Sequence, residues 1–271
     1  GASRVVHYEV AGEARSLSAR LVVAADGIRS LVRDQAGIEA DHIGYEQVAI
    51  TAVMTTQRFH DYVAYERFTE EGPIAILPLT DGRCGMVWTR KPAEVERMLA
   101  LSDDEFLREF QSAFGFRLGR FLRIGQRASY NLMLSRADRH IAQRLAVVGN
   151  AAQGLHPIAG QGFNLGLRDA MSLAEVIADR RVAGTMDPGD ARLLQDYAEW
   201  RESDRRRIVA FTDGLVRLFA TPLGVLRSLR SLGILAFDVL PPAKSALARL
   251  SVGAAERVPR LARGVPLAGI R

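Results

Sequence analysis

The stretch RLAVVGNAAQGLHPIAGQGFNLGLRDAMSLAEVIADR, residues 144–180, joins an apolar run to a long helical pattern through a glycine-rich loop. Residues 145–148 are continuously apolar, which predicts a short strand buried on both faces. From Asn164 onward, apolar residues recur at three- and four-residue spacing, which predicts an amphipathic helix. The stretch holds five glycines, more than a simple turn needs, and this indicates that something lies against its backbone.

The glycines of this loop favour a ligand that is flat or anionic. Gly154, Gly160 and Gly162 lack a Cβ, so a ligand can approach the main chain closely. The N–H groups of Gly162, Phe163 and Asn164 would open the helix and attract negative charge. The alternative is a long loop whose glycines serve only its turns.

A second turn of the same kind lies in LVVAADGIRSLVRDQAGI, residues 21–38. An apolar strand is followed by Asp26-Gly27 and a helix start, with Ser30 and Arg33 one helical step apart. An acid at this position accepts a ligand hydroxyl or caps the next helix, and capping alone would explain Asp26.

Together the two stretches resemble the downstream fingerprints of the single-component flavoprotein aromatic hydroxylases. The resemblance implies that the first stretch lies near the FAD pyrophosphate and takes part in NADPH use. It implies that the second stretch, Gly149 through Asn164, holds the ribityl chain and the isoalloxazine ring. The cofactor-binding residues implied are Asp26, Gly27, Arg33, Gly149, Asn150, Gly162, Phe163 and Asn164.

Asn150 and Gln153 depart from the pattern of most members, which have Asp and His at these positions. This part of the sequence resembles the 2-octaprenyl-6-methoxyphenol hydroxylase branch of ubiquinone biosynthesis. Two further stretches share that resemblance: YERFTEEGPIAILPLTDGRCGMVW at 65–88 and FQSAFGFRLG at 110–119. The resemblance implies an FAD-dependent monooxygenase that uses NADPH and O2 to hydroxylate a polyprenyl phenol.

The resemblance also implies that Pro157 through Gly160 line the pocket where oxygen reacts, so Pro157 and Gly160 are its candidate catalytic residues. His156, next to Pro157, invites a general-base role, although a lone histidine in a turn more often makes a structural hydrogen bond.

No G-x-G-x-x-G motif opens the chain, whereas the family begins with this phosphate-binding motif. Instead, RVVHYEV and ARSLSARLVV predict two strands joined by residues 11–13. We therefore expect that the chain starts midway through the cofactor domain and that these 271 residues alone bind FAD weakly. Two other classes stay open: a non-catalytic scaffold of a quinone-synthesis complex, and a flavin reductase or dehydrogenase that does not insert oxygen.

The fold class expected is mixed α+β and α/β. Residues 1–40 and 141–185 are expected to form an incomplete three-layer FAD-binding domain, and 186–271 a C-terminal helical region. Residues 41–140 hold β-rich runs with two helical patterns, near 92–100 and 102–114, the second opened by a capping box of Ser102 and Glu105. We expect an antiparallel substrate domain there, in which Tyr65, Phe68, Trp88 and Tyr130 pack in the sheet or wall the substrate cavity.

Composition predicts a soluble, cytoplasmic enzyme. The single Cys84 excludes an intramolecular disulfide framework, and the five histidines show no metal-ligand spacing. The net charge of +5 is spread along the chain without an aromatic-interleaved basic motif, which favours a solvated surface over nucleic-acid binding.

The C-terminal part shows two further patterns. The charged cluster 201–207 interrupts an apolar stripe, and a solvated helix face is the default interpretation. Residues 221–263 combine leucines at helical spacing with scattered arginines, which predicts helices that meet the inner-membrane surface or a membrane-bound quinone-synthesis complex, making the enzyme peripheral to that membrane. The alternative is that these leucines pack onto the cofactor domain.

Overall fold

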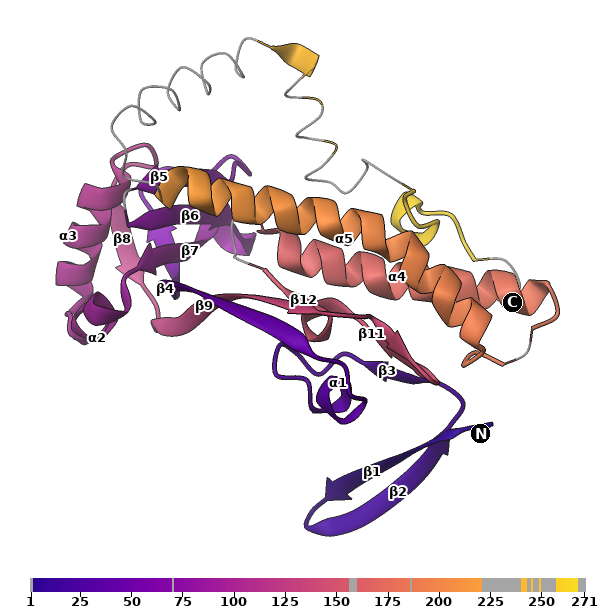
Figure 1. The fold of residues 1–271 in the computed structure, drawn as a ribbon. Coiled ribbons are helices and arrows are strands. Elements are labelled where there is room, and N and C mark those ends of the chain that lie inside the picture. Colours follow the sequence, from indigo (N-terminus) through magenta and orange to yellow (C-terminus); the bar gives the residue numbers. More distant parts are fainter. Residues whose placement is uncertain are drawn as a thin grey trace. The chain divides into compact units, whose positions relative to one another are not determined.

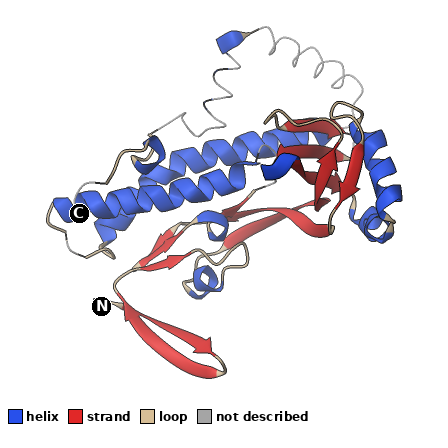
Figure 2. Cartoon of the chain, turned by 180° about the vertical axis from the view of Figure 1, so that it is seen from behind, coloured by secondary structure: helices blue, strands red, loops and turns tan. Residues whose placement is uncertain are grey.

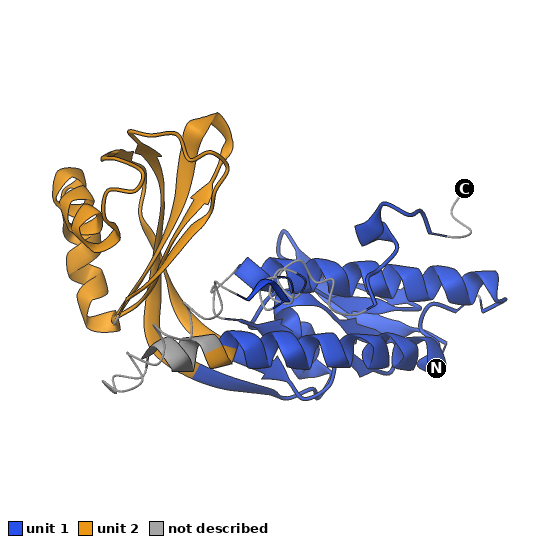
Figure 3. Cartoon of the chain, turned by 90° about the horizontal axis from the view of Figure 1, so that it is seen from above, with its two compact units in different colours: residues 1–43, 134–212, 233–271 blue, residues 44–133, 213–232 orange. Residues whose placement is uncertain are grey.

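The computed structural model describes residues 2–69, 71–155, 160–185, 187–220, 240–242, 245, 249 and 257–267, with the side chains of 215–220 excepted. The chain divides into two compact units (Figure 3). Unit 1 comprises residues 1–43, 134–212 and 233–271, and unit 2 comprises residues 44–133 and 213–232. The expected domain boundaries lay near residues 40 and 140, whereas the units divide after residues 43 and 133. Residues 187–212, expected in a separate C-terminal region, group with unit 1.

The elements follow the sequence patterns closely (Figures 1 and 2). The strands are β1 (Arg4–Val10), β2 (Glu13–Ala19), β3 (Val22–Ala24), β4 (Ala40–Thr56), β5 (Tyr65–Thr69), β6 (Gly72–Pro78), β7 (Arg83–Arg90), β8 (Phe121–Ile124), β9 (Ala128–Ala137), β10 (Ile141–Ala142), β11 (Leu145–Val147) and β12 (Gln153–Gly154). The helices are α1 (Leu31–Gln35), α2 (Pro92–Ala100), α3 (Asp103–Phe114), α4 (Gln161–Val182) and α5 (Ala191–Ala220), with short 3-10 turns η1 (Thr80–Gly82), η2 (Gly149–Ala151) and η4 (Leu261–Arg263).

The centre of unit 1 is a sheet in the order β10–β11–β3, in which β11 and β3 are parallel. Successive side chains of a strand point to opposite faces, and β11 buries both. Leu145 and Val147 pack with Ala24 and Ile38 on one face. Ala146 and Val148 pack against apolar residues of α4 and α5 on the other. The predicted two-sided burial of this strand is confirmed.

Helices α4 and α5 lie side by side and run antiparallel over the part of α5 that belongs to unit 1 (Figure 1). Asp169, in the first half of α4, accepts a hydrogen bond from Arg201 of α5 at 2.8 Å. Further along α4, Arg180 donates to Asp196, near the start of α5, at 2.8 Å. Leu173 and Val176 of α4 share a buried cluster with Leu193, Leu194 and Tyr197 of α5.

Unit 2 is built on an antiparallel sheet in the order β4–β7–β6–β5, with β8 paired to β4. Helices α2 and α3 contribute to its core, where Trp88 packs edge-to-face on Phe106 and Phe110 at centroid distances of 5.6 and 5.2 Å. Such ring pairs add to the free energy gained by burial. Trp88 is therefore a core residue, whereas Tyr130 is exposed.

The mixed α and β class and the antiparallel sheet are confirmed, as is the capping box: Ser102 and Glu105 bond reciprocally at the start of α3. One detail was wrong. The expected strand over 14–23 breaks after Ala19 into β2 and β3, which belong to different sheets. Strand β2 thus forms a hairpin with β1, while β3 pairs with β11.

Among the described helices, none is both long and apolar enough to cross a membrane.

Candidate functional site

Both glycine-bearing loops leave the same edge of the unit 1 sheet. Strands β3 and β11 are parallel and in register from Val22 opposite Leu145 to Ala24 opposite Val147. The Val148 N–H then donates to the Ala24 carbonyl at 2.9 Å. The two predicted motifs therefore begin side by side at the carboxyl ends of parallel strands, which is where open α/β sheets bind ligands.

In the first loop, the Asp26 carboxylate caps α1. It accepts hydrogen bonds from the Ser30 hydroxyl and from the Val32 N–H, the latter at 3.2 Å. Partial burial raises the pKa of Asp26, but these hydrogen bonds outweigh it and the pKa lies below its usual value. Asp26 is exposed, so capping leaves part of its carboxylate accessible. Gly27 follows with φ of 91°, a conformation that side chains rarely adopt.

Arg33 lies beneath the loops rather than beside them, with only 2% of its surface exposed. Its Nη1 donates to the carbonyls of Ile28 and Ala151 at 3.2 and 3.1 Å. Its Nε and Nη2 donate to Asp34 at 2.9 and 2.8 Å. The guanidinium thus ties the first loop to the second, and its predicted contact with the cofactor would be indirect.

In the second loop, Gly149 turns the chain with φ of 59° and packs against α4. Its N–H donates to Asp169 of α4 at 3.0 Å, so this donor is already paired within the chain. The Gln153 amide bridges the Gly149 carbonyl and the same Asp169 oxygen, at 3.2 and 3.0 Å. Asn150, between them in sequence, is exposed.

Helix α4 begins at Gln161, three residues before the predicted start, after Gly160 in the left-handed conformation. Helix geometry leaves the N–H groups of Gly162 and Phe163 without an intrahelical acceptor, whereas the Asn164 N–H faces the Gly160 carbonyl. Phe163 is 79% exposed. The structure therefore brings Gly160, Gly162 and Phe163 into one open helix start, while His156 and Pro157 lie outside the described residues.

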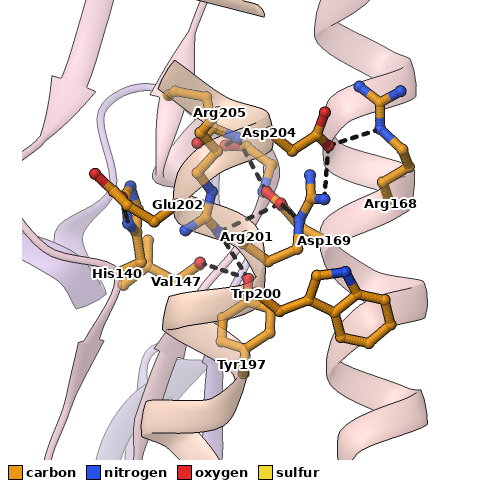
Figure 4. A network of polar contacts seen from close by, with 12 residues as sticks. His140, Val147, Arg168, Asp169, Tyr197, Trp200, Arg201, Glu202, Asp204 and Arg205 are labelled. Carbon is orange, nitrogen blue, oxygen red and sulfur yellow. Dashed lines mark hydrogen bonds and ion pairs between the residues drawn. The ribbon is translucent and has the colours of Figure 1, made fainter. Parts of the chain in front are cut away.

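A buried network of charges joins α4 and α5 (Figure 4). Asp169 is fully buried, with Arg201 Nε at 2.8 Å and Arg205 Nη2 at 3.3 Å from its Oδ1. Asp204 accepts from Arg201 at 2.6 Å and lies 3.1 Å from Arg168 Nε. Burial raises the pKa of Asp169, but the charges of Arg205 and Arg201 outweigh it, so the pKa is lowered and the carboxylate stays ionised.

This network corrects the interpretation of the cluster 201–207 as a solvated helix face. Arg201, Asp204 and Arg205 are buried, whereas Arg206 and Arg207 are exposed. The signal was present in the spacing, because these three residues continue the helical face that Tyr197 and Ile208 define. The charges of these residues masked the signal, because charged residues are almost never fully buried unless they are paired.

The C-terminal segment that the structure describes binds to α4. Glu175, which is 3% exposed, accepts from Arg257 Nη2 at 3.0 Å and from the Arg260 N–H at 2.6 Å. Arg257 also stacks on Trp200 of α5, 3.8 Å from the ring centroid. These arginines belong to the segment expected at a membrane surface, yet they pair with α4; most of 221–263 lies outside the described residues.

His140, at the edge of the network, should make the protein sensitive to mild acid. Burial, and then the positive charges of Arg205 and Arg201, lower its pKa to about 3, while Asp169 opposes them. The Glu202 carboxylate lies 3.8 Å from Nδ1, too far for a hydrogen bond. Below about pH 6.5, His140 is therefore protonated in the unfolded chain but stays neutral in the folded protein.

We expect the free energy of unfolding to fall by up to about 1.4 kcal/mol per pH unit as the pH drops from 6.5 towards 3. Between pH 7 and pH 5, urea unfolding should show the unsubstituted protein losing about 2 kcal/mol more than His140→Asn. His42→Asn, the same change at an exposed histidine, is the control. Equal losses in all three proteins would contradict this account of His140.

Comparison with known proteins agrees with this geometry. Residues 1–212 match the family model described as FAD binding domain. Ubiquinone hydroxylase UbiL of Rhodospirillum rubrum is 42% identical over 259 residues, covering 94% of this chain and 60% of that protein. The mitochondrial ubiquinone biosynthesis monooxygenase COQ6 of Xenopus tropicalis is 30% identical over 273 residues, covering 88% of this chain and 58% of that protein. The chain thus spans less than two thirds of the length of these relatives.

Solved structures share the fold. The p-nitrophenol 4-monooxygenase of Pseudomonas putida DLL-E4 matches with a TM-score of 0.72 at 20% identity, over 94% of this chain and 65% of that one. The OxyS anhydrotetracycline hydroxylase of Streptomyces rimosus matches with a TM-score of 0.69 at 21% identity, over 99% of this chain and 51% of that one. Because the family model covers well over half of its residues, the chain belongs to the FAD binding domain family.

Proposed function

We propose that the protein containing this chain is an FAD-dependent, NADPH-using monooxygenase that hydroxylates a polyprenyl phenol in ubiquinone biosynthesis. The observation that carries the proposal is the meeting of both glycine loops at the carboxyl edge of the β3–β11 pair. The relatives named ubiquinone hydroxylase and ubiquinone biosynthesis monooxygenase support the substrate class.

Three glycines of these loops leave their backbone open to a ligand such as FAD. A Cβ placed on Gly27, Gly160 or Gly162 would meet nothing within 4 Å. The start of α4 offers backbone donors and the positive end of a helix dipole, which suit the anionic parts of a flavin nucleotide. In this proposal Asp26, Gly27 and Arg33 serve the pyrophosphate side, Arg33 by holding the loops. Gly149, Asn150, Gly162, Phe163 and Asn164 serve the ribityl chain and the ring.

When bound, FAD supplies electron transfer from NADPH and the activation of O2. The chain's own part is to hold the ring, with Gly160 on the side where oxygen reacts; the role expected of Pro157 falls outside the described residues. Residues 41–140 form the substrate domain of this proposal. A polyprenyl tail belongs in lipid or in an apolar groove, so the partner proposed is a membrane surface or a quinone-synthesis complex.

The test uses protein expressed from the complete coding sequence. We expect a yellow complex with FAD after gel filtration, NADPH oxidation stimulated by a short-tailed polyprenyl phenol, and a hydroxylated product by mass spectrometry. NADPH oxidation without hydroxylated product in the presence of substrate would favour the flavin reductase. No retained flavin would favour the scaffold.

Asn150→Ala tests the second loop. If the exposed amide of Asn150 bonds to the ribityl chain, its loss should weaken FAD binding by about 1–2 kcal/mol. This corresponds to a dissociation constant about 5- to 30-fold higher in a flavin fluorescence titration. The control is Asn131→Ala, the same change at an exposed position of β9. Equal affinity in both variants would remove Asn150 from the site.

A further inference from the structure

One buried side chain joins the second loop to α5. Asp169 has no exposed surface, and its two oxygens serve different partners. Oδ2 accepts from the Gly149 N–H and from the Gln153 amide, both at 3.0 Å. Oδ1 accepts from Arg201 at 2.8 Å, with Arg205 at 3.3 Å. One oxygen thus fixes the loop. The other is held by Arg201 and Arg205 of α5 (Figure 4).

A second link from α5 reaches the strand just before the loop. Arg205 Nη2 donates to the Tyr197 hydroxyl at 2.8 Å, and that hydroxyl donates to the Val147 carbonyl at 3.3 Å. The two links flank the point where β11 ends and the loop turns. Both start from α5 residues that are buried.

The loop has little room to take another path on the α4 side. A Cβ on Gly166 of α4 would lie 3.0 Å from the Gly149 Cα, so helix and loop backbones are in direct contact. On the opposite side, Arg33 holds the Ala151 carbonyl. The loop conformation therefore depends on a small number of polar contacts, of which Asp169 makes two.

We infer that Asp169 is a positioning residue: held by Arg201 and Arg205, it fixes the conformation of residues 149–154 that receives the flavin. That the ligand is a flavin rests on the proposed function. The effect of Asp169 on the conformation of the loop does not. An ionised carboxylate can accept from all four donors at once, whereas an amide has only one acceptor oxygen. Asp169→Asn therefore keeps the size of the side chain and forces the loop and α5 to compete for it.

The experiment compares Asp169→Asn with unsubstituted protein from the complete coding sequence. In flavin-free protein, we expect amide exchange of residues 149–154 to accelerate at least tenfold, while β7 in unit 2 exchanges as before. With FAD, we expect the dissociation constant to rise at least tenfold and the flavin absorbance band to shift. A merely structural role would accelerate exchange throughout unit 1 and leave the flavin spectrum of the remaining folded protein unchanged.

Two further variants keep the test decisive. Asp196→Asn makes the same change at a half-exposed carboxylate of α5 that pairs with Arg180, and both readouts should stay within twofold. Gln153→Leu removes the bridging amide without touching the charges, so it should act in the same direction as Asp169→Asn even if that variant does not fold.

Exchange and affinity within twofold of the unsubstituted protein, in whichever of Asp169→Asn and Gln153→Leu folds, would overturn the inference. The failure of the proposed function looks different. In that case the unsubstituted protein binds no FAD, while the exchange measurement still decides whether Asp169 fixes the loop.

Discussion

Replacing Arg201 by Met should lower the free energy of unfolding by about 3–5 kcal/mol. The guanidinium is 1% exposed and bonds to Asp169 and Asp204 at 2.8 and 2.6 Å. Methionine fills much of the same volume but leaves two buried carboxylates with only Arg205 and Arg168 to balance them. Removing one member of a buried charge group is costly because the remaining charge stays out of water. Urea unfolding at pH 7 measures the loss.

The matched control lies five residues further along α5. Arg206 pairs with Glu202 at 2.6 Å, but its side chain is 76% exposed. Arg206→Met should therefore change the free energy of unfolding by no more than about 1 kcal/mol. A loss in Arg201→Met as small as that in Arg206→Met would show that the buried network adds nothing to stability.

Gly166→Val should lower the free energy of unfolding by about 2–3 kcal/mol. The first side-chain carbon would lie 3.0 Å from the Gly149 Cα, and backbone cannot rotate away as a side-chain tip can. Helix propensity points the other way, since valine is a better helix former than glycine. The sign of the effect therefore separates steric contact with the loop from propensity.

Gly214→Val provides the comparison, because a Cβ at Gly214 of α5 meets nothing within 4 Å. It should leave stability unchanged or raise it by a few tenths of a kcal/mol. Thermal and urea unfolding of both variants decide the question. A stabilised Gly166→Val would mean that the loop yields easily, against the contacts made by Asp169 and Arg33.

The sequence predicted the parts of the site whose signals are local. The two-sided burial of β11 follows from four successive apolar residues, and the start of α3 from the spacing of Ser102 and Glu105. The two loops were also predicted, because glycines and turn residues mark them directly. Each of these features depends on neighbours within a few residues.

What escaped prediction depends on partners far away in the chain. For Arg33, nothing near it in sequence reveals that Ala151 supplies an acceptor. Arg201 and Arg205 looked solvated because their compensating Asp169 lies on another helix. Likewise, the short strand β8 carries no alternation of its own and is defined by pairing with β4.

Arg33 has a consequence for how the loops respond to each other. One guanidinium holds the carbonyls of Ile28 and Ala151, the latter 118 positions away in the chain. A displacement of either loop strains the bond to the other, so the two loops are energetically coupled. Such coupling is reciprocal: the free energy by which binding at the first loop favours binding at the second equals that by which the second favours the first. The two loops therefore respond as a single unit.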